Sequence, residues 1–508
     1  MRRLALSLIV LAVGWAAFGQ LQGHLGPRSA AVLSAAPLEP APADAPPYSS
    51  RFIRAGAPWT QQAISGVAAD FAAVLNSADF PDSTAALLLD PRTGRPLYAH
   101  NADRPLTPAS TLKLIVAATA LHYLGPGYRF STAIVSDGAP RGDELAGDVW
   151  LVGGGDPELL SDDLRAAARA LKAAGIRRIR GNVYADGSAF GTEAANKTWL
   201  ADDLPYGYAA LPSAVSIGGG TAQFTITPDA GGGEAAVSID PPQSAGRLSG
   251  AVATAPAWGA NTLRIDALPD GSGFALSGSI PAGPPQKYWR SLEHPTLSAA
   301  SALRALILQA GIAVDGVAAA AKAPAQSTEL WRHSSRPLRD IIKRMTFDSD
   351  NHIAEQLLRA VGRQVYGIGT LPNGVAAERT FLKRLGLEDR AVVLADGSGL
   401  STADRVTARV LGAVLRSMVA AQDAAASVDL LPRVGVDGTA KYRPVAADAI
   451  GKIVGKDGYI EGASGLAGYV KTAHHGVVVY ALLVDGWHRG LDAVWRDEDD
   501  LLARLSRR

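Results

Sequence analysis

A predicted helix opens with Thr107-Pro108-Ala109-Ser110-Thr111-Leu112-Lys113 and continues to about Tyr123. Proline suits a helix start, because its missing N–H would have no partner there. Ser110 and Lys113 are three residues apart, so on a helix they share a face and the amine can reach the hydroxyl. A lysine among apolar neighbours can lose its proton near neutral pH and act as a base. The pair indicates a nucleophilic serine, although Ser-x-x-Lys also occurs as a capping serine beside a solvated lysine.

A second motif, Ser349-Asp350-Asn351, stands at the start of another predicted helix that runs to Val365. A serine hydroxyl and an asparagine amide on a turn can face a serine–lysine pair. In that position they would relay a proton to a leaving amine and orient the base. The alternative is that Ser349 or Asp350 only caps the helix.

A third motif is formed by Lys456-Asp457-Gly458-Tyr459, which we expect at the edge of a strand. A lysine followed by a glycine would let the backbone lie close to a substrate carboxylate and to an oxyanion. Serine–lysine, Ser-x-Asn and Lys-x-Gly in this order are typical of penicillin-recognising serine acyl enzymes.

The chain resembles the D-alanyl-D-alanine carboxypeptidase/endopeptidase group, the class C low-molecular-mass penicillin-binding proteins. The resemblance runs from about Ala85 to Val484 and includes Gly153-Gly154-Gly155-Asp156-Pro157 and Asp396-Gly397-Ser398-Gly399-Leu400-Ser401. The separation of Ser110 from Ser349 is too long for a simple β-lactamase, and it fits the family's habit of inserting two β-rich domains between these motifs.

The resemblance implies a role for each motif residue. Ser110 is the expected acylated nucleophile and Lys113 its base. Ser349 and Asn351 are expected to serve proton relay and substrate positioning. The backbone N–H groups of Ser110 and Tyr459 would form the oxyanion hole, which does not depend on the tyrosine side chain. The turn from Asp396 to Ser401 is interpreted as structural.

One position departs from the family, whose third motif is usually Lys-Thr-Gly. Lys456 and Gly458 are expected to line the substrate wall, but Asp457 replaces the threonine that helps to hold the substrate's terminal carboxylate. An aspartate would repel that carboxylate by about 1 kcal/mol if solvated and by a few kcal/mol if partly buried. One hypothesis is an active enzyme that prefers amidated cross-bridges and acts mainly as an endopeptidase. The alternative is a catalytically impaired homologue that serves as a cell-wall binding or scaffolding module.

Composition limits the other classes of function. The chain has 508 residues and a formal net charge of +1, so no charge excess indicates nucleic acid as a partner. Cysteine is absent, which excludes disulfides, Cys-ligated zinc and thiol catalysis. No metal or cofactor is implied. The expected partners are peptidoglycan stem peptides, with β-lactams as inhibitors.

The N-terminus is typical of an exported protein. Met1-Arg2-Arg3 precedes an uncharged apolar run from Leu4 to Phe18. We therefore expect a signal peptide or a signal anchor over residues 1–22 and an Ala/Pro-rich linker over residues 23–55. The expected location is the extracytoplasmic side of the membrane, a periplasm-like space or the cell wall, with an N-terminal membrane anchor if the signal is retained.

The predicted fold class is α/β (α+β), with a β-lactamase/transpeptidase-like serine acyl-enzyme domain split by a β-rich two-domain insertion. The catalytic domain is expected to comprise residues 56–127 and 326–508. The insertion is expected over residues 128–325, with a smaller all-β unit nested at about 235–282. Short β-like runs between glycine clusters in the middle of the chain, and long helical patterns after Arg336, support this division.

Overall fold

The computed structural model describes residues 56–76, 80–81, 83–191, 194–387, 391–420, 427–487 and 490–508. The predicted signal segment and linker, residues 1–22 and 23–55, lie outside the described residues. In the part of the chain that is described, no helix has the length and apolar character needed to cross a membrane.

A five-stranded antiparallel sheet joins the two ends of the described chain, and its strand order is β2-β1-β22-β21-β20. The central strands are buried on both faces, as their continuous apolar sequences require. The strands are β1 (Thr84–Leu89), β2 (Pro96–His100), β20 (Ile453–Ile460), β21 (Ala463–Lys471) and β22 (Val477–Asp485). Residues near the start and the end of the chain therefore build one core, and β20 is left as an edge strand.

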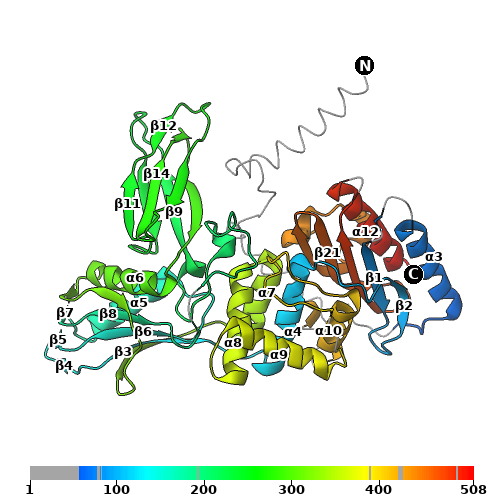
Figure 1. The fold of residues 1–508 in the computed structure, drawn as a ribbon, viewed down its shortest axis with the longest axis horizontal. Helices are drawn as coiled ribbons and strands as arrows, with labels where there is room; N and C mark the ends of the chain where they lie inside the picture. The colour runs from blue at the N-terminus through cyan, green and yellow to red at the C-terminus, as the bar shows by residue number, and fades with distance from the viewer. Residues whose placement is uncertain are drawn as a thin grey trace.

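Helices cover both faces of this sheet (Figure 1). On one face, α3 and α12 pack their apolar stripes against the sheet, in a core that includes Phe71 and Leu501. On the other face, α10 packs directly on the sheet, α4 lies beside α10, and α7, α8 and α9 pack around α4. The helices are α3 (Gln61–Leu75), α4 (Lys113–Tyr123), α7 (Leu338–Asp348), α8 (Asn351–Tyr366), α9 (Leu371–Arg384), α10 (Ala408–Ala420) and α12 (Leu491–Ser506). Because α4 is enclosed in this way, its first residue lies deep in the protein.

The middle of the chain forms separate sheets. One has the order β18-β8-β6-β3-β19 and another the order β17-β7-β5-β4, and α5 and α6 pack on them. The elements are β3 (Ser131–Ser136), β4 (Pro140–Arg141), β5 (Glu144–Leu145), β6 (Val149–Gly153), α5 (Ser161–Ala173), β7 (Arg178–Ile179), β8 (Val183–Asp186), α6 (Pro295–Gln309), β17 (Ala313–Val314), β18 (Ala318–Ala320) and β19 (Thr328–Ser334). Since β19 pairs with β3, this sheet continues past residue 325, where the insertion was expected to end.

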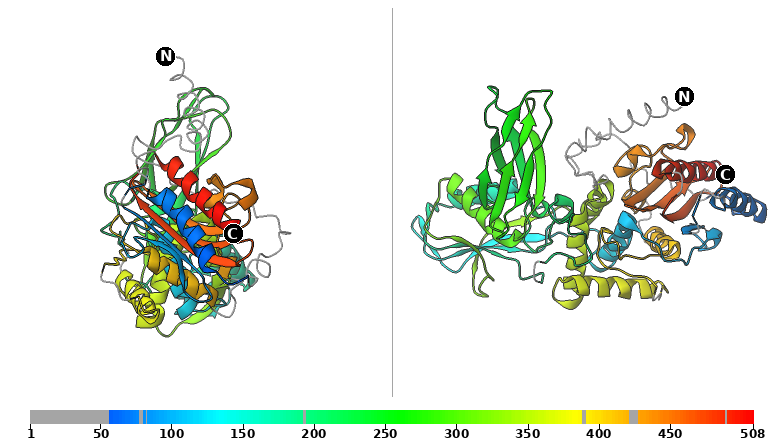
Figure 2. Two further views of the ribbon diagram at one scale, coloured as in Figure 1. Left: turned by 90° about the vertical axis from the view of Figure 1, so that its right-hand side faces the viewer. Right: turned by 45° about the horizontal axis from the view of Figure 1, so that its top comes forward.

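The nested β unit projects from the inserted sheets (Figures 1 and 2). Its strands are β9 (Thr221–Thr227), β10 (Ala236–Asp240), β11 (Arg247–Gly250), β12 (Ala253–Ala255), β13 (Arg264–Ala267), β14 (Gly273–Ser277), β15 (Ser279–Pro281) and β16 (Gln286–Ser291). The unit is larger than the predicted range 235–282, because β9 and β16 complete its sheet. The alternating buried residues Ala222, Phe224 and Ile226 of β9 mark that strand in the sequence.

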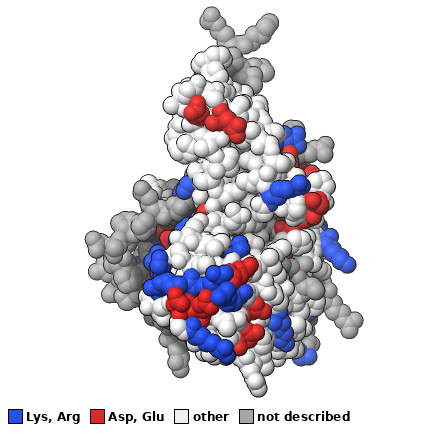
Figure 3. All heavy atoms as spheres, turned by 90° about the vertical axis from the view of Figure 1, so that its left-hand side faces the viewer, with Lys and Arg blue, Asp and Glu red and all other residues white. Residues whose placement is uncertain are grey.

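Charges of both signs interleave at the outer end of the inserted sheets, whereas most of the nested unit above them is uncharged on the face shown in Figure 3. Exposed ion pairs account for this pattern: Arg178 binds Asp315 and Arg180 binds Glu144. Such paired surface charges contribute little to stability and produce no field of a single sign.

Candidate active site

Ser110 and Lys113 lie where the short 3-10 helix η1 (Ala109–Leu112) runs into α4. The Lys113 side chain is fully buried, and its Nζ lies 2.9 Å from Ser110 Oγ. The spacing of the two residues thus produces a direct contact between amine and hydroxyl.

Two further oxygen atoms contact the amine. Lys113 Nζ donates to Asn351 Oδ1 at 2.7 Å and to the backbone carbonyl of Ser398 at 2.7 Å. Both partners are pure acceptors, whereas the hydroxyl of Ser110 can also donate. A neutral amine has two N–H donors and one lone pair, so it can serve both acceptors and still accept the proton of Ser110. The three contacts fit a lysine acting as a base.

Electrostatics favour the neutral form of this lysine. Burial lowers the pKa of Lys113 to about 7, and the positive charge of Lys456 lowers it as well. The carboxylates of Asp396, Asp350 and Glu355 act in the opposite direction and keep the pKa from falling further. The amine therefore titrates near neutral pH, which suits a general base.

The Ser-x-Asn motif lies at the junction of α7 and α8. Ser349 adopts a left-handed conformation with φ 55° and ends α7, and Asp350 caps α8 by accepting the N–H of Ile353 at 3.0 Å. This turn directs Asn351 toward the lysine. Its Nδ2 donates to the backbone carbonyl of Tyr208, in η2 (Gly207–Ala209) of the insertion, at 3.0 Å. Among the described residues, Ser349 is not a hydrogen-bond partner of Lys113.

The turn from Asp396 to Ser401 supplies the Ser398 carbonyl. Glu355 Oε1 accepts the N–H groups of Gly397 at 2.8 Å and Ser398 at 3.0 Å, and Glu355 Oε2 pairs with Arg359 at 2.8 Å. The carboxylate therefore holds the two peptide units that precede the Ser398 carbonyl, and so helps to place the oxygen that contacts Lys113. The sequence analysis interpreted this turn as structural and did not predict its contact with Lys113. That contact is made by a backbone carbonyl, which every residue type has.

The same turn packs directly on the backbone of Ala109 and Ser110. Asp396 accepts the N–H groups of Gly399 at 2.6 Å and Ser401 at 2.8 Å, and also the indole N–H of Trp199, from the insertion, at 2.8 Å. Gly399 has φ +77°, and a Cβ there would lie 1.9 Å from the carbonyl oxygen of Ala109. Ala109 itself has φ 45°, which is strained for a residue with a side chain.

The third motif lies on β20, beside η1. A Cβ on Gly458 would lie 2.8 Å from the backbone nitrogen of Ser110, so only glycine allows this approach. Lys456 is fully buried, and its Nζ contacts Asp457 Oδ1 at 2.8 Å, the Asp457 carbonyl at 2.6 Å and Thr439 Oγ1 at 3.3 Å. Thr439 begins η4 (Thr439–Tyr442) and was not predicted, because it belongs to none of the three motifs.

The Asp457 carboxylate is held in its charged form. Burial would raise its pKa, but the charge of Lys456 and the hydrogen bonds from Lys456 and Thr439 outweigh that effect and bring the pKa below its ordinary value. Thr439 Oγ1 donates to Asp457 Oδ1 at 2.5 Å. Two residues further along the strand, Tyr459 places its ring 6.3 Å from that of Trp487.

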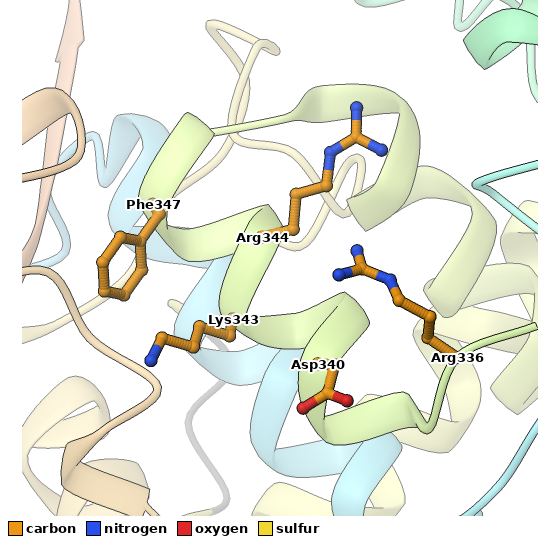
Figure 4. A pocket seen from close by; sticks show the side chains of 5 residues that line it. All are labelled: Arg336, Asp340, Lys343, Arg344 and Phe347. Carbon is orange, nitrogen blue, oxygen red and sulfur yellow. The ribbon is translucent and has the colours of Figure 1, made fainter. Parts of the chain in front are cut away.

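A cavity of about 280 Å³ opens on the outer side of α7. Figure 4 shows Lys343 and Phe347 projecting on one side of this helix and the guanidinium groups of Arg336 and Arg344 on the other. The two arginines pair with Glu158, and the Lys343 ammonium lies 5.3 Å from the centre of the Phe347 ring. None of the predicted site residues lines this cavity.

The chain belongs to the D-Ala-D-Ala carboxypeptidase 3 (S13) family, whose pattern matches residues 67–507. It is accordingly a serine-type D-Ala-D-Ala carboxypeptidase, as the family resemblance implied. A D-alanyl-D-alanine carboxypeptidase of Actinomadura sp. (strain R39) is 32% identical over 435 residues, which cover 83% of this chain and 80% of that protein. The D-alanyl-D-alanine carboxypeptidase DacB of Haemophilus influenzae is 27% identical over 396 residues, covering 77% of this chain and 83% of the relative.

The fold is also shared with a solved structure. Penicillin binding protein 4 (dacB) of Haemophilus influenzae superposes with a TM-score of 0.74 at 24% sequence identity, over 88% of this chain and 99% of that one. The predicted fold class is therefore confirmed. The same relative has been solved in complex with a β-lactam, with a TM-score of 0.68 and 23% identity to this chain.

Proposed function

We propose that Ser110 attacks the carbonyl of the penultimate D-alanine of a peptidoglycan stem peptide and becomes acylated. Lys113, as a neutral amine, takes the proton from Ser110 Oγ while the C–O bond forms. The C–N bond then breaks, and the proton taken up by Lys113 passes by way of Ser349 to the leaving amine, which restores the neutral lysine, while Asn351 orients that lysine. Water hydrolyses the ester, which releases the shortened peptide and restores Ser110. The observation that carries this proposal is the 2.9 Å contact between Lys113 Nζ and Ser110 Oγ at a fully buried amine.

The oxyanion formed during attack needs two donors, and we assign the backbone N–H groups of Ser110 and Tyr459. The support for this assignment is the close approach of β20 to η1 at Gly458. In addition, β20 is an edge strand, so part of its backbone N–H groups are not used by the sheet.

The insertion contributes to the same site in this proposal. The Tyr208 carbonyl orients the Asn351 amide, and the Trp199 indole holds Asp396, so two segments of the insertion brace the catalytic residues. This supports a division of the chain into a catalytic part, formed by its two ends, and a β-rich insertion that completes the substrate cleft.

Peptidoglycan lies outside the cytoplasmic membrane, so the proposed activity requires export. The basic start and uncharged apolar run of the N-terminus support this location. Both the removal of a terminal D-alanine and the opening of D,D cross-links are reactions of the same acyl-enzyme. β-Lactams, which acylate serine enzymes of this kind, are the expected inhibitors.

A labelled penicillin tests the proposal directly. The full chain should become covalently labelled, and mass spectrometry should locate the added mass on Ser110. The variant Ser110→Ala should not label, whereas Ser277→Ala, on the exposed nested unit, should label as the natural chain does. Labelling at another serine would contradict the assignment of Ser110, and a folded protein that never labels would favour a non-catalytic wall-binding role.

A further inference from the structure

The strand that lies beside Ser110, β20, carries a positive charge near Lys113. That charge is Lys456, which is close enough to lower the pKa of Lys113. A peptide that ends in D-alanine carries a carboxylate, and the natural partner of a carboxylate is a cation with free N–H donors. The state of Lys456 therefore determines which terminal group this strand can accept.

The donors of Lys456 are already occupied. An ammonium has three N–H groups, and three oxygen atoms lie within hydrogen-bond distance: Oδ1 of Asp457, the carbonyl of Asp457 and the hydroxyl of Thr439. Only 1% of the Lys456 side chain is exposed. The cation is thus satisfied from within the protein and is shielded from a ligand.

Asp457 is the more accessible member of the pair, with 17% of its side chain exposed. Its Oδ1 receives hydrogen bonds from Lys456 and Thr439, whereas in the described part of the chain Oδ2 receives none. The charges of Lys456 and Asp457 cancel, and the exposed atom is a hydrogen-bond acceptor. A substrate group at this strand consequently meets an acceptor and not a cation.

We infer that the preferred substrate carries a carboxamide, in place of a free carboxylate, on the residue that follows the scissile bond. A carboxamide is neutral, and its two N–H groups can donate to Asp457 Oδ2. A carboxylate at the same place would face that oxygen with like charge, and it could reach Lys456 only by breaking the buried ion pair. The substrate class is therefore amidated stem peptides, and this inference rests on the function proposed for Ser110.

Two matched pairs of substrates test the inference with the full chain. One pair is an acyl-D-Ala-D-Ala peptide and its C-terminal amide. The other is a D,D cross-linked muropeptide with a free or an amidated carboxyl next to the scissile bond. We expect kcat/KM to be at least about tenfold higher for the amidated member of each pair.

The variants Asp457→Asn and Asp457→Thr separate charge from shape. Both variants remove the negative charge, and Asp457→Thr also introduces the hydroxyl that the family usually has at this position. We expect Asp457→Asn to lose the preference for the amidated substrate and Asp457→Thr to prefer the free acid. Asp448→Asn, which removes a carboxylate from an exposed ion pair with Arg507, should leave the preference unchanged. Melting temperatures show whether each variant is folded.

The outcomes distinguish the two proposals. Penicillin labelling at Ser110 together with faster cleavage of the free acid would overturn the inference about Asp457 and leave the catalytic assignment intact. Equal preference in the natural chain and in Asp457→Asn would overturn it as well. Absence of labelling in a folded protein would instead contradict the proposed function itself.

Discussion

Lys113 Nζ and Asn351 Oδ1 lie 2.7 Å apart, although 238 positions separate the two residues in the sequence. The whole β-rich insertion lies between them, and α4 and α8 pack side by side to bring them together. In this contact Asn351 Oδ1 accepts a hydrogen bond from Lys113. Asn351 Nδ2 donates to the Tyr208 carbonyl of the insertion. The contact made by Lys113 thus depends on both parts of the chain.

Acylation should follow the titration of Lys113. Since burial lowers the pKa of this amine to about 7, the neutral base dominates above that pH and the protonated form below it. The acylation rate should therefore fall about tenfold for each pH unit below 7 and reach a plateau above it. Stopped-flow acylation by a chromogenic β-lactam between pH 5 and 9 measures this profile; a flat profile through pH 7 would contradict a lysine base.

The variant Asn351→Asp should move this profile to higher pH. An aspartate oxygen would still accept from Lys113, but its negative charge would stabilise the protonated amine and raise the pKa of Lys113 by about 1 unit or more. The acylation rate at pH 7 should fall and recover as the pH rises. Asn373→Asp, at the start of α9, is the matched control and should leave the profile in place.

Glu355→Gln should move the same profile in the opposite direction. Glutamine keeps an oxygen for the N–H groups of Gly397 and Ser398, but it removes a negative charge that raises the pKa of Lys113. The inflection should therefore appear at lower pH. If Glu355 only supports the turn, the variant would reduce the acylation rate without moving the inflection, and the pH profile separates these cases.

Gly399→Ala should lower the acylation rate. The reduction should exceed what is expected from the cost of placing an alanine at a positive φ. The new Cβ would meet the Ala109 carbonyl at 1.9 Å and displace the residue before Ser110. Gly386→Ala is a matched control, since Gly386 has φ +76° and no atom within 4 Å of the added carbon. The control should lose about 1–2 kcal/mol of stability and keep its activity. Gly399→Ala should lose at least about tenfold in acylation rate; equal activities would show that the turn does not position the nucleophile.

Arg443→Met should destabilise the part of the chain that contains the five-stranded sheet. Arg443 is fully buried and pairs with Glu498 at 2.7 Å and Asp499 at 3.0 Å, so its removal leaves two buried carboxylates without their cation. The expected loss is about 3–5 kcal/mol in the free energy of unfolding. Arg507→Met breaks only the exposed pair with Asp448 and should cost no more than about 1 kcal/mol. Urea denaturation of both variants checks the difference.

Local patterns predicted the elements that bear the motifs. The spacing of Ser110 and Lys113 on a helix, the turn before Asn351 and the strand around Gly458 all follow from short stretches of sequence. The predicted range of the nested unit, 235–282, leaves out strand β9, although the alternating apolar residues of β9 indicate a strand. Strand β19 lies beyond residue 325 and still pairs with β3, because a strand's partner is set by tertiary pairing and not by its own sequence.

The sequence by itself determined the chemistry available to this protein: a serine and a lysine on one helical face, an asparagine on a turn, and an aspartate where the family has threonine. Only the tertiary structure decided how these groups behave. The pKa of Lys113 depends on burial by helices distant in the chain, and its second acceptor is a backbone carbonyl that no residue type reveals. Likewise, Thr439 and the Lys456–Asp457 pair meet because a separate loop packs on β20. Short-range spacing encodes helices and strands, whereas desolvation and backbone contacts arise only when remote segments pack together.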